Sequence, residues 1–79
     1  MNGQYAELDA REQKLGETVK AHIALRSHQG KLWLDVRKWM KYPNISEFLS
    51  SKKGIMMELD DWKRVIPLMQ ELIEANSPK

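Results

Sequence analysis

Apolar residues alternate with charged or aromatic residues from Lys31 to Arg37, which is the two-residue period of a β-strand. On one face of this predicted strand, which runs to about Met40, the side chains are Leu32, Leu34 and Val36, and we expect this face to pack in the core. The opposite face combines cations with indole rings. Its residues are Lys31, Trp33, Asp35, Arg37 and Trp39.

A second alternation precedes this strand, from Thr18 to Arg26. The segment between the two, Ser27 to Gly30, ends in glycine and predicts a hairpin turn, so the two strands should pair antiparallel. Their polar faces then form one surface. That surface should carry Lys20, Arg26, Lys31 and Arg37, with Trp33 and Trp39 among them and His28 at the turn.

The segments around this hairpin have weaker patterns. Residues 45–49 favour a short third strand, 50–54 a polar loop that contains Lys52 and Lys53, and 55–59 a fourth strand. Residues 1–13 sustain no period, and a short helix and a disordered arm both remain open. We therefore expect a flexible or peripheral arm over 1–14 and one domain over 15–76.

The last segment changes to a helical period. The apolar residues recur every three or four positions, which predicts a helix from about Leu59 to Ala75 with Asp60 and Asp61 in its first turn. Pro67 should kink it. The apolar stripe is wide for one small sheet, so we expect it also to meet a second copy of the chain. The predicted fold is α+β: a four-stranded curved antiparallel sheet followed by one kinked C-terminal helix, in a homodimer.

Composition narrows the functional classes. The chain has 79 residues and no cysteine, so a small core without disulfides or thiolate metal sites is expected, and no metal or cofactor is predicted. No apolar run long enough for a membrane span and no signal-peptide pattern are present, which predicts a soluble, intracellular protein. The positive charge is confined to residues 14–54, where nine Lys or Arg face three acids.

Cations interleaved with aromatic rings are typical of a surface that binds single-stranded nucleic acid. Two other interpretations remain open: the tryptophans close a subunit contact beside solvated charges, or the sheet binds a protein partner. An enzyme is poorly supported. Neither His22 nor His28 has a serine or cysteine partner at a known spacing, and Asp60-Asp61 fits the start of a helix.

Three short motifs occur in a fixed order. They are Gly30-Lys31-x-x-x-Asp35-Val36-Arg37-x-Trp39, then Lys52-Lys53-Gly54-Ile55, then Trp62 eight residues after Gly54. With four strands and one helix, this arrangement resembles the transcriptional coactivator family called positive cofactor four, over about residues 15 to 75.

The resemblance implies a homodimer whose curved sheets bind single-stranded DNA or melted duplex with little sequence preference. Lys31, Arg37, Lys52 and Lys53 match the family's basic positions, and Lys20 and Arg26 match its basic first strand. Where the family has aromatic residues, this chain has His28 and Met40. Stacking would then use His28, Trp33, Trp39 or Tyr42.

The Ser/Lys-rich extension of eukaryotic members does not occur in this sequence, which suggests a bacterial or phage member acting in replication, recombination, repair or transcription. The expected location is the cytoplasm and nucleoid, or the host cytoplasm for a phage protein and the nucleus for a eukaryotic one. Two alternatives stay open: a transcription cofactor that acts mainly through protein partners, such as replication or transcription proteins, and an RNA-binding module.

Overall fold

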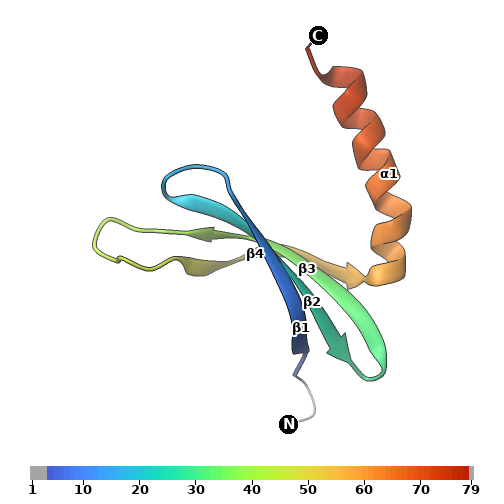
Figure 1. The fold of residues 1–79 in the computed structure, drawn as a ribbon, viewed down its shortest axis with the longest axis horizontal. Coiled ribbons are helices and arrows are strands. Elements are labelled where there is room, and N and C mark those ends of the chain that lie inside the picture. The colour runs from blue at the N-terminus through green and yellow to red at the C-terminus, as the bar shows by residue number, and fades with distance from the viewer. Residues whose placement is uncertain (1–3, 79) are drawn as a thin grey trace.

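The structure is a computed structural model that describes residues 4–78. It consists of a sheet and one helix (Figure 1). The elements are β1 (Ala6–Lys14), β2 (Val19–His28), β3 (Lys31–Met40), β4 (Leu49–Glu58) and α1 (Leu59–Asn76). The strands pair antiparallel in the order β1-β2-β3-β4, so the sheet is a simple meander. The predicted α+β class, with four antiparallel strands and one C-terminal helix, is confirmed.

The turn between β2 and β3 is as tight as the sequence predicts. His28 pairs with Lys31, which leaves only Gln29 and Gly30 in the turn. Both residues have positive φ, 51° at Gln29 and 77° at Gly30. Positive φ at both central residues characterises the turn whose twist matches that of the flanking strands. The hairpin therefore fixes the register of the two central strands along their whole length.

The N-terminal segment differs from expectation. Residues 6–14 form neither a short helix nor a disordered arm but the edge strand β1, which pairs with β2 and has a register shift between Glu7 and Asp9. Its residues are exposed except for the half-buried Ala10, so no apolar alternation marks the strand in the sequence. The segment is peripheral, as expected, yet it belongs to the sheet. The predicted domain boundary at residue 15 stays a prediction.

The assignments around β4 are also corrected. Residues 45–48 form no strand, and the predicted strand over 45–49 contributes only Leu49 to β4. Residues 50–54, predicted to be a loop, belong to β4, where the register with β3 shifts between Arg37 and Trp39. Strand pairing uses backbone groups, so polar side chains at an exposed edge do not prevent it.

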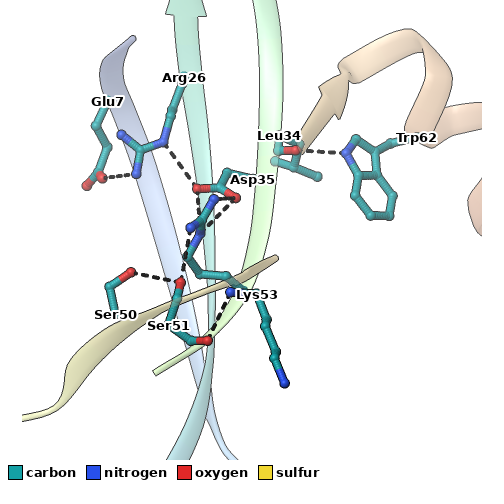
Figure 2. A network of polar contacts seen from close by, with 9 residues as sticks. Glu7, Arg26, Leu34, Asp35, Ser50, Ser51, Lys53 and Trp62 are labelled. Carbon is teal, nitrogen blue, oxygen red and sulfur yellow. Dashed lines mark hydrogen bonds and ion pairs between the residues drawn. The ribbon is translucent and has the colours of Figure 1, made fainter. Parts of the chain in front are cut away.

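The helix α1 follows β4 directly, with Asp60 and Asp61 in its first turn as predicted. Trp62 attaches it to the sheet: the side chain is buried, and its indole Nε1–H donates a 2.8 Å hydrogen bond to the Leu34 carbonyl (Figure 2). Beyond this anchor the helix projects away from the sheet (Figure 1). It continues through Pro67 to Asn76, and the kink expected at Pro67 stays a prediction.

Candidate nucleic-acid interface

Cross-strand pairing gathers most of the predicted site residues on one face of the sheet. The pairs are Lys20 with Trp39, His22 with Arg37, Arg26 with Trp33, and His28 with Lys31. Residues directly opposite each other in an antiparallel pair point to the same side. We call this side the polar face: Lys20, His22, Arg26 and His28 of β2 with Lys31, Trp33, Asp35, Arg37 and Trp39 of β3. The alternation in the sequence therefore predicted the membership of this face correctly.

Asp35 is the centre of the polar face and is only 5% exposed. Arg37 donates to its carboxylate from Nε at 3.2 Å and from Nη2 at 3.1 Å. The Arg26 Nε lies 3.6 Å from the same carboxylate (Figure 2). Arg37 also donates from Nη1 to the Ser51 carbonyl at 3.1 Å. One carboxylate thus orients two guanidinium groups, and the group of three keeps a net positive charge.

Gly54 of β4 makes room for this arrangement. It lies opposite Arg37 in the sheet. A Cβ at this position would lie 2.5 Å from the Arg37 Cβ and 2.9 Å from the Val36 carbonyl oxygen, closer than real Cβ atoms come. Glycine in a strand interior marks such a close approach. The glycine of the Lys52-Lys53-Gly54-Ile55 motif is therefore explained by the placement of Arg37.

Acidic residues also pair with the other cations of the polar face. Glu12 of β1 accepts hydrogen bonds from Lys20 Nζ at 2.9 Å and lies 2.8 Å from His22 Nδ1. Hydrogen bonds from Lys20 and His22 hold the pKa of the Glu12 carboxyl below its usual value. Glu7 lies 3.6 Å from Arg26. Two acids of the segment that the sequence assigned to a peripheral arm, Glu7 and Glu12, therefore lie on the polar face itself.

The hairpin end of this face has an acid partner as well. Lys31 Nζ lies 3.1 Å from a carboxylate oxygen of Glu58, the last residue of β4. The side chain of Lys31 remains 66% exposed in this pair. Exposed pairs of this kind contribute little to stability, so Lys31 stays accessible to another anion.

Lys52 and Lys53 lie apart from these pairs. Both are exposed in β4, and neither has a carboxylate oxygen within 4.0 Å among residues 4–78. The Lys53 backbone N–H donates to Ser51 Oγ at 3.0 Å, and its side chain extends away from Asp35 (Figure 2). These two lysines therefore lie in the edge strand β4, outside the Asp35 network.

Three of the four predicted stacking residues, His28, Trp33 and Trp39, already have ring partners, whereas the fourth, Tyr42, is exposed in the segment after β3. At the hairpin end, Tyr5 stacks on His28 with centroids 4.2 Å apart and meets Trp33 edge-on at 5.6 Å. At the other end, His22 stacks on Trp39 at 4.7 Å. The indole Nε1 atoms of Trp33 and Trp39 are buried without a hydrogen-bond partner among the described residues. Tyr5 is thus a member of the site that the sequence did not single out, and the stacking of His22 on Trp39 was not predicted either, because contact across strands cannot be read from local spacing.

Between the two ring clusters the face is hollowed. An open cavity of about 450 Å³ is lined by Tyr5, His22, Arg26, Asp35, Arg37 and Trp39, among others. Within residues 4–78, no group of three His, Cys, Asp or Glu side chains is placed to hold a metal ion. In the same part of the chain, no helix has the length and apolarity to cross a membrane.

An open antiparallel sheet with arginines, lysines and aromatic rings on one face combines the groups that hold phosphates and stack on bases in single-stranded nucleic-acid complexes of other proteins. The family model described as Transcriptional Coactivator p15 (PC4) matches residues 15–68, and the chain belongs to this family. The family is one of DNA-binding transcriptional coactivators, and the resemblance noted in the sequence is confirmed. Comparisons with curated proteins and with solved structures gave no match.

Proposed function

We propose that this chain binds single-stranded DNA with little sequence preference, as a homodimer, through the polar face. The observation that carries the proposal is the register of β2 and β3, which sets Arg26 and Arg37 between the ring clusters that contain Trp33 and Trp39. Guanidinium groups suit phosphates and aromatic rings suit bases. Membership of a DNA-binding coactivator family supports it.

Asp35 prepares the two arginines for phosphate. Because its carboxylate receives Nε and Nη2 of Arg37, the guanidinium is fixed before a ligand arrives, and less side-chain entropy is lost on binding. Asp35 alone does not neutralise two arginines, and the second carboxylate, that of Glu7, is half-exposed and 3.6 Å from Arg26, so a phosphate can replace Glu7 beside this guanidinium. Lys31 at the hairpin end of the face, and Lys52 and Lys53 in the edge strand β4, then add further phosphate contacts.

The apolar side of the molecule supports the homodimer. Leu72 and Ile73 of α1 are 66% and 61% exposed, and Ile55 of β4 is 59% exposed. Trp62 is the one α1 residue that is buried in a single copy, within the described part of the chain. A second copy packed on this side would remove these side chains from water and enlarge a small core.

The role we propose is non-enzymatic, in any process that exposes single strands: replication, recombination, repair or transcription, in the nucleoid or the corresponding host compartment. The two alternative functions are a transcription cofactor that acts mainly through protein partners and an RNA-binding module. A pulldown whose partners survive nuclease treatment favours the first of these alternatives. Competition with an oligouridine of the same length tests the second.

The test is fluorescence anisotropy of a labelled oligothymidine of about 20 nucleotides, titrated at several salt concentrations beside a matching duplex. We expect the single strand to bind more tightly and its affinity to fall steeply with salt, because bound phosphates release counterions. Binding to neither nucleic acid at low salt would overturn the proposal.

A further inference from the structure

A second group of cations and rings lies in the segment between β3 and β4. Lys41 Nζ is 4.7 Å and Lys20 Nζ is 4.6 Å from the centroid of the Phe48 ring. Both distances are within the roughly 6 Å range of cation–π attraction. Phe48 is half-buried although its segment is irregular, so the ring has a defined place against the two lysines.

This group is continuous with the polar face. Lys20 Nζ also lies 5.3 Å from the Trp39 ring, so one lysine touches both Trp39 and Phe48. The backbone N–H of Lys41 donates to the Thr18 carbonyl at 2.8 Å, which holds Lys41 beside the start of β2. The segment extends from the end of the sheet that is remote from the β2–β3 hairpin (Figure 1). Phe48 therefore continues the row of rings beyond Trp39.

The two lysines differ in their carboxylate partners. Lys20 has Glu12 as its carboxylate partner, whereas Lys41 has no carboxylate oxygen within 4.0 Å among residues 4–78. A neutral ring shared by two ammonium groups does not offset their mutual repulsion. An anion beside Lys41 would do so.

We propose that Lys41 and Phe48 bind one further nucleotide of single-stranded DNA, past Trp39. The phosphate draws the Lys41 ammonium away from the ring, and the base stacks on the ring face that is released. A nucleotide fits better than an acidic peptide because ring and cation occur together and in line with Trp39. This inference rests on the proposed function and adds a binding site at the end of its path.

The test compares Phe48→Ala, Phe48→Tyr and Lys41→Gln by anisotropy with the same oligothymidine. We expect Phe48→Ala to weaken binding roughly tenfold, and Phe48→Tyr, which keeps a ring, to bind like the wild type. Lys41→Gln should reduce the slope of log affinity against log salt by about 0.7. Control variants are Ile45→Ala, an exposed apolar residue of the same segment, and Lys38→Gln, whose cross-strand partner Ala21 lies outside the polar face.

The outcomes separate the two proposals. If the wild type binds DNA and Phe48→Ala and Lys41→Gln match the controls, the additional nucleotide site is refuted and the proposed function stands. If Phe48→Tyr loses as much affinity as Phe48→Ala, the ring acts by packing and the site is refuted as well. If the wild type binds no DNA but binds a polyglutamate peptide through Lys41, the anion is a protein and both proposals fail. Thermal melts of each variant identify a loss that comes from unfolding.

Discussion

The two edge strands of the sheet are alike in exposure and opposite in charge. β1 is exposed at nearly every position and places Glu7 and Glu12 beside the cations of β2. β4 is exposed over most of its length and places Lys52 and Lys53 at the other edge, without carboxylate partners within 4.0 Å among residues 4–78. The positive charge of the sheet is therefore neutralised at its β1 edge and left unneutralised at its β4 edge.

This difference indicates how a nearly neutral chain can attract a polyanion. Ion pairs at the β1 edge keep the side chains of the polar face ordered and reduce its positive electrostatic field. The β4 edge instead presents net positive charge to the solvent. The central Asp35 network belongs to neither edge. Variants of the centre should change stability, and variants of the two edges should change DNA binding in opposite directions.

The largest effect is expected at the centre. Asp35→Ala leaves Arg37 without the carboxylate that it contacts at 3.1 Å, and we expect a loss of about 1.5–3 kcal/mol in the free energy of unfolding. Urea denaturation followed by circular dichroism measures it. The control is Asp9→Ala. Asp9 pairs with Leu25 and lies on the other face of the sheet, so its replacement should reduce the free energy of unfolding little. Equal stability of the two variants would contradict the claim that the Asp35 network stabilises the fold.

The next effect concerns the basic edge. Replacing Lys52 and Lys53 together by Gln removes two exposed cations, so the salt slope of single-strand binding should fall by about 1.4 and the affinity at low salt with it. Thermal stability should stay close to that of the wild type because neither side chain has an ion-pair partner in the described residues. A salt slope that does not change would show that DNA does not pass over this edge.

The acidic edge should respond in the reverse sense. Glu7→Gln with Glu12→Gln releases Lys20 and Arg26 from competing carboxylates, and we expect single-strand affinity to rise a few-fold at low salt. Asp9→Asn is the control for each single variant, Glu7→Gln or Glu12→Gln, because it removes one negative charge from the same strand on the other face of the sheet. If the control raises affinity as much as each single variant, the gain comes from net charge and the pairing has no part in it.

The smallest effect is a pH dependence of stability. Lys20 and His22 hold the pKa of the Glu12 carboxyl below the ordinary value of a glutamate, so the folded state favours the ionised carboxyl. The resulting stabilisation is present above the ordinary carboxyl range and is lost as pH falls through the lowered pKa of the folded protein. Melting temperatures from pH 7 to pH 3 should fall less for Glu12→Gln than for the wild type, and parallel curves would contradict the assignment.

The features that the sequence could predict are those encoded by the residues of a single element. The alternation of β2 and β3, the Gln29-Gly30 turn and the apolar stripe after Leu59 each lie within one element, and each was predicted from the residues it contains. β1 was missed because both of its sides are exposed, and the start of β4 because polar residues fill its register shift. Exposed edges carry no burial pattern from which a strand can be inferred.

The candidate site was also predicted only in part. The face shared by Arg26, Trp33 and Arg37 follows from the two-residue period. The residues that contact this face from β1 and the segment before it could not be predicted in this way. Tyr5 contacts His28, and Glu12 contacts Lys20, only because β1 pairs with β2. The contact of Lys41 with Phe48 depends on how the irregular segment folds back, which no local pattern encodes.

The most direct test of the central claim uses the indole N–H signals of the three tryptophans in a ¹⁵N-labelled sample titrated with the oligothymidine. We expect the Trp33 and Trp39 signals to shift as DNA binds to the polar face. The Trp62 signal should move much less, because its indole is buried and bonded to the Leu34 carbonyl. Unmoved Trp33 and Trp39 signals during saturable DNA binding would contradict the claim that the polar face is the binding surface.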